Sequence, residues 1–303
     1  MNQAIIPLSV APGKRRAYLK NWRLATKNTG RLMLFAGDQK IEHLNNDFFG
    51  KNIAADDASP RHLFNIASRA HIGVFASQLG LVAQYGALYR HIPYLIKLNS
   101  KTNLISAKAQ DPVSGLLNTV ADVVEFKKMS RLKIVGVGYT LYPGSQFEHQ
   151  MLAQAAQVVY RAHRAGLLAV LWIYPRGRAI KNANDPQLAA GMAGLAACLG
   201  ADFVKLSPPQ GLTKTSYRTI IAAAGRTGVI FSGGESIDPK RFLNNLAVQI
   251  AAGARGNATG RNLHQRPLVE AIRLANAITA ISLAGYSASQ AYQIYLGKDK
   301  LIK

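Results

Sequence analysis

Eight short apolar segments rich in β-branched residues alternate with eight amphipathic segments along most of this 303-residue chain. The apolar segments predict strands and the amphipathic segments predict helices. The predicted strands are Leu32–Gly37, Ile72–Ser77, Tyr94–Asn99, Lys133–Gly138, Ala169–Tyr174, Phe203–Ser207, Val229–Ser232 and Gly256–Thr259. The predicted helices cover residues 59–70, 79–90, 117–129, 147–165, 186–199, 214–225, 239–253 and 267–284. Such alternation requires a parallel sheet covered by helices.

Eight strand–helix units are the number that closes a (β/α)8 barrel, the TIM-barrel architecture. The alternative, an open doubly wound sheet, usually carries a glycine fingerprint after its first strand, and Gly37-Asp38-Gln39-Lys40 is not one. We therefore predict an α/β fold with a single barrel over residues 31–285. A leader with an extra helix precedes the barrel over residues 1–30, and a C-terminal tail follows over residues 286–303.

The composition indicates a compact protein of a reducing compartment. Hydrophobic residues make up 49% of the chain and charged residues 17%, so a large core can be buried. The single cysteine, Cys198, excludes an internal disulfide. The longest clean apolar run covers residues 167–174, whereas a membrane-spanning helix needs about 20 residues. We expect a cytoplasmic protein without a membrane partner.

The chain is strongly basic, with 37 Lys and Arg against 15 Asp and Glu, a net charge of +22. Such a balance favours polyanionic partners such as nucleic acid or phosphorylated metabolites. The basic residues are scattered, however, and we find no RNP-like motif, finger spacing or basic tail. We interpret most of them as surface charge and expect no nucleic-acid partner. The alternative interpretation is a basic module that binds nucleic acid, with an affinity that falls steeply as the salt concentration rises.

Polar residues stand inside or directly after several predicted strands, and barrel enzymes carry their chemistry at the carboxyl ends of strands. Asp38 follows the first strand, where it is either a group at the barrel mouth or a turn residue. Lys205 lies within the apolar sixth strand. Burial lowers a lysine pKa and makes the amine a nucleophile that forms Schiff bases with ketones. The alternative is a lysine without a catalytic role, whose ammonium group reaches water or pairs with a carboxylate. The sequence pattern fits both interpretations equally well.

The later strands add aromatic and glycine-rich segments. Trp172 and Tyr174 share one face of the fifth strand, where they line a site or pack in the core. The seventh strand ends in Ser232-Gly233-Gly234, and Gly260-Arg261 follows the eighth. Glycines let backbone N–H groups approach an anion, and these two loops are the habitual phosphate site of this fold. The alternative is a pair of ordinary tight turns.

Metal-based chemistry has little support in the sequence. No two of the seven histidines share the spacing of metal ligands on one helix or strand. The chain also lacks a phosphate-binding loop of the Walker type and a nucleophile-elbow motif. We therefore predict no metal site, and chemistry based on an amine is favoured.

Together these segments resemble the archaeal-type class I fructose-1,6-bisphosphate aldolases, which are Schiff-base (β/α)8 enzymes. The resemblance runs from about Leu32 to about Ile272. Its most specific segments are Val137–Ser145, Trp172–Gly177, Gly200–Lys205, Ser232–Gly234 and Gly260–Asn262. It implies reversible cleavage of fructose 1,6-bisphosphate to dihydroxyacetone phosphate and glyceraldehyde 3-phosphate, without cofactor or metal. It also implies a homo-oligomer, since members of the family often form rings.

The resemblance also implies roles for particular residues. Lys205 would form the imine, Tyr174 would transfer protons, and Asp38 would complete the catalytic set. The residues expected to contact the substrate or its phosphates are Trp172, Arg176, Ser232, Gly233, Gly234, Gly260 and Arg261.

The chain departs from the family after the first strand. The family usually has Asp-His-Gly there, where this chain has Asp38-Gln39-Lys40. Lys40 would bring a second amine near the mouth, where it would bind a phosphate or alter the choice of substrate. Pro208-Pro209 differs from the family as well. The alternative function is therefore a sister Schiff-base barrel acting on another phosphorylated ketose or ketone by aldol, transaldol or thiolase-like chemistry.

Overall fold

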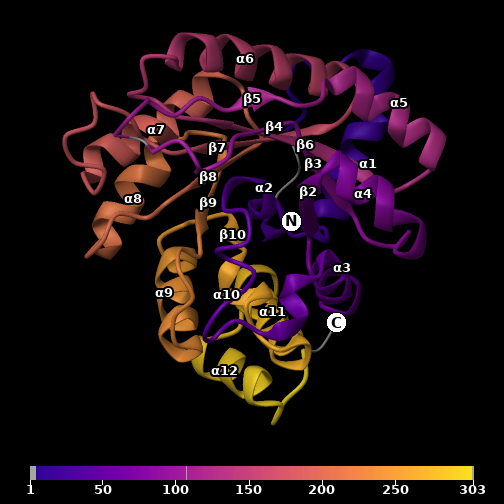
Figure 1. Ribbon diagram of the computed structural model, residues 1–303, viewed down its shortest axis with the longest axis vertical. Coiled ribbons are helices and arrows are strands. Elements are labelled where there is room, and N and C mark those ends of the chain that lie inside the picture. The colour runs from indigo at the N-terminus through magenta and orange to yellow at the C-terminus, as the bar shows by residue number, and fades with distance from the viewer. Residues whose placement is uncertain (1–4, 107, 302–303) are drawn as a thin grey trace.

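Eight parallel strands form a closed barrel in the computed structural model, which describes residues 5–106 and 108–301 (Figure 1). The barrel strands are β1 (Leu32–Ala36), β2 (Val74–Gln78), β3 (Tyr94–Lys97), β6 (Ile134–Leu141), β7 (Leu168–Ile173), β8 (Phe203–Leu206), β9 (Gly228–Ser232) and β10 (Gly256–Thr259). They follow one another around the barrel in chain order, and β10 closes it by pairing with β1. The predicted (β/α)8 architecture is confirmed.

A helix follows each barrel strand and covers its outer face (Figure 1). These helices are α3 (Pro60–Arg69), α4 (Leu79–Tyr85), α5 (Val120–Ser130), α6 (Glu148–Arg164), α7 (Pro186–Cys198), α8 (Lys214–Ala223), α9 (Pro239–Ala251) and α11 (Leu268–Ala284). Ser59, Asp185 and Asp238 begin α3, α7 and α9, and each side chain accepts a hydrogen bond from an N–H of the first turn. Proline follows each cap, where its missing N–H costs nothing.

Shorter elements complete the chain. Two one-turn helices, α2 (Gln39–Glu42) and α10 (Arg261–His264), follow β1 and β10 directly. The 3-10 turns are η1 (Pro12–Lys14), η2 (Ala55–Ala58) and η3 (Gly86–Leu88). A small antiparallel pair, β4 (Asn99–Ser100) and β5 (Gly115–Leu116), lies outside the barrel. Helix α12 (Ala288–Leu296) packs on α9 and α11, within the segment that the sequence analysis assigns to a tail.

Alternate side chains of each strand point into the barrel or toward the helices. The inward residues, including Leu34, Val170, Phe203 and Ile230, form one buried apolar cluster, and the outward residues belong to a larger cluster beneath the helices. The same alternation continues toward the carboxyl ends of the strands. On β1, β7 and β8, the inward-facing residues are therefore apolar along most of the strand and polar at that end of the barrel.

Helix α1 (Arg15–Thr26) covers the amino end of the barrel. Its Trp22 ring stacks on Phe203, with the ring centroids 5.2 Å apart. Its Tyr18 hydroxyl donates to Asp202, which also accepts hydrogen bonds from His163 Nε2 at 3.1 Å and from the Ala169 N–H at 2.7 Å. This buried carboxylate thus joins α1 to β7, β8 and α6. The division of the chain into leader, barrel and tail stays a prediction.

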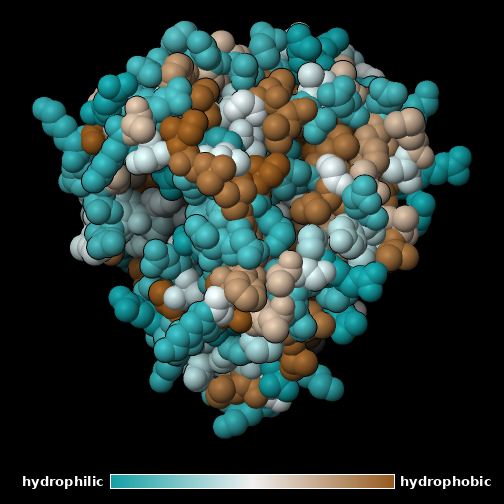
Figure 2. Space-filling model, in the orientation of Figure 1, coloured by the Kyte–Doolittle hydropathy of each residue, from teal (hydrophilic) through white to brown (hydrophobic). Residues whose placement is uncertain are grey.

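The surface carries both polar and apolar side chains. Figure 2 shows polar side chains over much of one face, with apolar patches in its upper part. Exposed apolar residues include Leu104, Ile105 and Leu117, around β4 and β5. Within the two described ranges, no helix has the length and apolar character needed to cross a membrane.

Replacing Asp202 with alanine tests the junction at the amino end. Three buried donors would lose their acceptor, so we expect Asp202→Ala to lower the free energy of unfolding by about 3 kcal/mol, measured by urea titration. Asp299→Ala is the control, because Asp299 is exposed and accepts only from the next N–H; we expect a change within about 0.5 kcal/mol. Equal stabilities of the two variants would contradict this account of Asp202.

Candidate active site

A cavity opens at the carboxyl end of the barrel and brings together every predicted site residue except Lys40. It is lined by Asp38, Gln39, Glu42, His43, Thr140, Trp172, Tyr174, Arg176, Lys205, Ser207, Ser232, Gly233, Gly234, Ala258, Gly260 and Arg261. These residues come from β1, β6, β7, β8, β9 and β10 or the loops that follow them. Residues far apart in the sequence therefore meet because the strands are parallel and end at the same edge.

Lys205 occupies an inward position on β8, beside Trp172 of β7 in the sheet register. Its side chain is 4% exposed, and Nζ lies 5.4 Å from the centroid of the Trp172 ring. Nζ makes no hydrogen bond with any described residue. Burial lowers the pKa of the Lys205 amine, and the negative charges of Asp38 and Glu42 partly oppose this effect. The amine is therefore nearer to its neutral, nucleophilic form than a surface lysine is.

A second buried lysine, Lys97 of β3, also lies beside the site tryptophan. Its side chain is 3% exposed, and its Nζ lies 5.4 Å from the centroid of the Trp172 ring. Nζ donates to the backbone oxygen of Asn99 at 2.9 Å and to its Oδ1 at 3.1 Å. Burial lowers the pKa of Lys97 to about 8. The sequence analysis missed this residue, although Lys97 stands inside an apolar strand as Lys205 does.

The acids of the site come from the end of β1 and from α2. The Oδ1 atom of Asp38 is buried and has no hydrogen-bond partner among the described residues. Glu42 accepts a hydrogen bond from the Tyr142 hydroxyl at 3.1 Å and pairs with Arg176, whose Nη1 lies 3.6 Å from its Oε1. Burial raises the pKa of Tyr174 well above its usual value, and both acids add to this effect. Tyr174 is therefore a protonated phenol near neutral pH.

The loops after β9 and β10 are tied together by Asn262. Its Nδ2 donates to the carbonyl oxygens of Gly233 at 3.0 Å and Glu235 at 2.7 Å, and its Oδ1 accepts from the Ile237 N–H at 3.0 Å. Gly234 has a φ of +66°, a conformation that glycine adopts without strain. The amide of Asn262 thereby holds two glycine-containing segments in fixed positions beside the cavity.

Lys40 differs from its expected placement. Its Nζ donates to the Ala58 carbonyl at 3.3 Å and lies 4.2 Å from the centroid of the Phe48 ring, and the residue does not line the cavity. Successive residues of a helix point in different directions, so two neighbouring residues of α2 do not both face the cavity. Gln39 faces the cavity and Lys40 faces η2.

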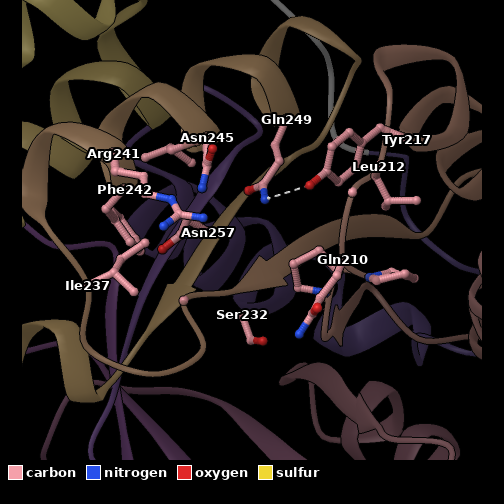
Figure 3. A pocket seen from close by; sticks show the side chains of 15 residues that line it. Gln210, Leu212, Tyr217, Ser232, Ile237, Arg241, Phe242, Asn245, Gln249 and Asn257 are labelled. Atoms are coloured by element: carbon pink, nitrogen blue, oxygen red, sulfur yellow. Dashed lines mark hydrogen bonds between the residues drawn. The ribbon is translucent and has the colours of Figure 1, made fainter. Parts of the chain in front are cut away.

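A larger cavity of about 620 Å³ lies beside the site, between the segment after β8 and helices α8 and α9 (Figure 3). Ser232 and Gly233 line both cavities. Figure 3 shows Gln249 turned toward Tyr217, and its Nε2 donates to that hydroxyl at 3.4 Å. In residues 5–106 and 108–301, no group of three or more His, Cys, Asp or Glu side chains is arranged to hold a metal ion.

The pKa of Lys205 is testable through its reaction with a small unphosphorylated aldehyde such as propanal. Only the neutral amine forms an imine, so labelling of the Lys205 peptide after borohydride reduction rises with pH through this pKa, with a midpoint below 10.5. Asp38→Asn removes a charge that raises the pKa, so we expect its midpoint at lower pH. Asp299→Asn should leave the midpoint in place. A shift to higher pH in Asp38→Asn would contradict the electrostatics described above.

Comparison with known proteins agrees with this geometry. The family model described as DeoC/LacD family aldolase matches residues 32–266. A protein of Methanocaldococcus jannaschii named fructose-bisphosphate aldolase/6-deoxy-5-ketofructose 1-phosphate synthase is 55% identical over 297 residues, covering 97% of this chain and 95% of the relative. A solved fructose-bisphosphate aldolase from Slackia heliotrinireducens is 47% identical, with a TM-score of 0.97 over 100% of this chain and 96% of that chain.

An archaeal fructose-1,6-bisphosphate aldolase has been solved with its catalytic lysine covalently bound to the carbinolamine intermediate of the substrate. It is 29% identical to this chain, with a TM-score of 0.76 over 87% of this chain and 98% of that chain. These matches confirm the family that the sequence motifs indicate. The chain belongs to the DeoC/LacD family of aldolases.

Proposed function

We propose that this aldolase reversibly cleaves fructose 1,6-bisphosphate to dihydroxyacetone phosphate and glyceraldehyde 3-phosphate through an imine on Lys205. The observation that carries the proposal is the Lys205 amine itself, which is buried without a hydrogen bond at the carboxyl end of the barrel. The names of the M. jannaschii and S. heliotrinireducens relatives support the substrate. The covalent carbinolamine of the archaeal relative supports the use of a lysine.

The reaction begins when neutral Lys205 attacks the C2 ketone and the resulting carbinolamine loses water. The protonated imine then accepts the electron pair of the C3–C4 bond while the C4 hydroxyl gives up its proton, so that the aldehyde leaves and an enamine remains. Protonation of the enamine at C3 and hydrolysis of the imine release dihydroxyacetone phosphate. The imine is the electron sink, and the scheme needs no metal.

Two other side chains would move the protons. The buried, unpartnered Oδ1 of Asp38 is an acceptor suited to the proton of the C4 hydroxyl. The raised pKa of Tyr174 keeps its phenol protonated, so this residue is suited to donate a proton at C3. In the direction of condensation, the same groups act in the opposite sense.

The two phosphates would bind at opposite sides of the reacting carbons. Gly233, Gly234, Gly260 and Arg261 would hold the ketone-side phosphate with backbone N–H groups and a guanidinium. Arg176, whose side chain is 50% exposed at the rim, would contact the distant phosphate. Binding energy from both ends would hold C2 beside the amine. A homo-oligomeric state and a cytoplasmic location stay predictions.

A second candidate function is the formation of 6-deoxy-5-ketofructose 1-phosphate, which the name of the M. jannaschii relative includes. This possibility corresponds to the sister enzyme that the altered Asp38-Gln39-Lys40 segment left open. The imine chemistry would be shared, and the two activities would differ in the substrates bound. Measuring turnover of fructose 1,6-bisphosphate alone and with candidate carbonyl acceptors separates them.

Trapping with borohydride tests the role of Lys205. Dihydroxyacetone phosphate and borohydride should add one reduced adduct to the Lys205 peptide, identified by mass spectrometry. Lys205→Ala should lose both the adduct and the cleavage activity. Lys108→Ala is a control on a surface lysine, and it should keep both. A Lys205→Ala variant that still traps and cleaves would defeat the assignment.

Tyr174→Phe tests the proton-transfer role. Loss of the phenol should slow turnover of fructose 1,6-bisphosphate by about 100-fold or more, because general acid–base catalysis contributes at least this factor. Trapping of dihydroxyacetone phosphate on Lys205 should persist. Tyr139→Phe is the matched control, since its hydroxyl bonds to Gln154 away from the cavity. A wild-type turnover rate in Tyr174→Phe would contradict the proton-transfer role and would indicate that Tyr174 serves only in packing.

A further inference from the structure

A buried carboxylate joins three loops at the rim of the active site. Asp111, on the segment between β4 and β5, is 4% exposed. Its Oδ2 accepts a hydrogen bond at 2.9 Å from the backbone N–H of Gln146, which lies between β6 and α6. Its Oδ1 accepts from the backbone N–H of Arg178 at 2.9 Å and from Nε of the same residue at 3.3 Å, in the segment after β7. The two oxygens of one side chain therefore hold two different loops.

The donors around Asp111 keep it in its ionised form. The hydrogen bond from the Gln146 N–H lowers the pKa of Asp111, burial partly opposes this effect, and the bonds and charge of Arg178 add to it. An ionised carboxylate accepts at both oxygens, so it serves both loops at once. Hydrogen bonds to a charged acceptor are about twice as strong as those between neutral groups. Arg178 Nη2 also donates to Gln146 Oε1 at 3.2 Å, which joins the two loops a second time.

The segment after β7 packs directly on the loop after β6. The Arg176 N–H donates to the Pro143 carbonyl at 3.0 Å. A Cβ added at Gly177 would collide with the Gly144 carbonyl oxygen, so glycine is required for this close approach. The bonds to Asp111 follow one residue later in the chain. The backbone of Arg176 is therefore held from both loops.

The position of this backbone matters because Arg176 reaches the rim with a long side chain that is 50% exposed. Its guanidinium carbon lies 5.7 Å and 5.5 Å from the centroids of the Tyr142 and Tyr174 rings. Its Nη1 lies 3.6 Å from Oε1 of Glu42. Such contacts are weak at a partly exposed site, so they do not fix the guanidinium by themselves. A misplacement of about 1 Å is enough to reduce a rate by about 100-fold.

We propose that Asp111 is a positioning residue for binding of the phosphate distant from the ketone. It holds the backbone of Arg178 beside that of Gln146, and this keeps Arg176, two residues earlier in the chain, where its guanidinium meets that phosphate. Asp111 thereby sets the preference for fructose 1,6-bisphosphate over sugars phosphorylated only beside the ketone. The assignment rests on the proposed imine at Lys205 and on the proposed role of Arg176.

Cleavage of two sugars separates this role from a general structural one. Fructose 1-phosphate differs from fructose 1,6-bisphosphate only in lacking the distant phosphate. Asp111→Asn keeps the size of the side chain, but an amide has one accepting oxygen, so one loop meets an NH2 group in place of an acceptor. We expect the ratio of kcat/KM for the bisphosphate to kcat/KM for the monophosphate to fall at least 5-fold, mainly through a higher KM for the bisphosphate. The kcat/KM for fructose 1-phosphate should change by less than twofold.

Further variants show whether Asp111 acts through Arg176. Arg176→Met should lower the ratio at least as far as Asp111→Asn does, and combining the two should lower it little further, because both changes remove the same contact. Asp111→Ala removes both acceptors and should lower the ratio more than Asp111→Asn. Asp122→Asn is the matched control, since Asp122 is an exposed carboxylate that also accepts a backbone N–H, at the start of α5, and it should leave the ratio unchanged.

Three results would overturn the assignment. The first is an equal fall of kcat/KM for both sugars in Asp111→Asn, which would indicate a structural role only. The second is an unchanged ratio. The third is full additivity of Asp111→Asn and Arg176→Met. Wild-type protein that cleaves both sugars equally well would instead overturn the proposed role of Arg176, and wild-type protein that cleaves neither would overturn the proposed function, and this assignment would fall with either.

Discussion

Burial of a lysine amine inside a ring of parallel strands is the constraint on which the rest of the site depends. An ammonium group without solvent or a close partner is costly, and the cost is reduced when the group gives up its proton or faces opposite charge. Lys205 meets both conditions in part, because burial lowers its pKa while Asp38 and Glu42 oppose that shift. The balance leaves an amine whose pKa lies below that of a surface lysine, and imine formation requires the neutral amine.

The positions of the other groups follow from the same geometry. Acids at and just after the end of β1 face amines on β3 and β8 because the barrel is closed, and their negative charges partly oppose the lowering of both lysine pKa values by burial. The loops after β9 and β10 are held by side chains behind them, with Asn262 bonded to three backbone groups and Arg266 bonded to the Ile237 carbonyl at 2.7 Å. A rigid support behind a binding loop preserves its shape between turnovers.

The order of the elements was predictable from the sequence because each strand and helix has a local signal. The inward position of Lys205 was predictable for a related reason, since a charged residue within an apolar strand is conspicuous. Lys97 carries the same signal and was overlooked. The direction of the Lys40 side chain was not predictable. If the short helix α2 began one residue earlier or later, Lys40 and Gln39 would exchange directions. The contact of Asp57 with His264 joins residues 207 positions apart, and no local pattern specifies it.

The chain contains only two tryptophans, and the fold has placed them at opposite ends of the barrel. Trp22 stacks on Phe203 beneath the strands, whereas Trp172 lies at the open end, where the Nζ atoms of Lys97 and Lys205 are each 5.4 Å from its ring centroid. Their indole emission therefore comes from two separate environments within one molecule. A single fluorescence spectrum combines a signal sensitive to docking of the first helix with one sensitive to charge changes beside the reacting lysine, and replacing either indole isolates the other.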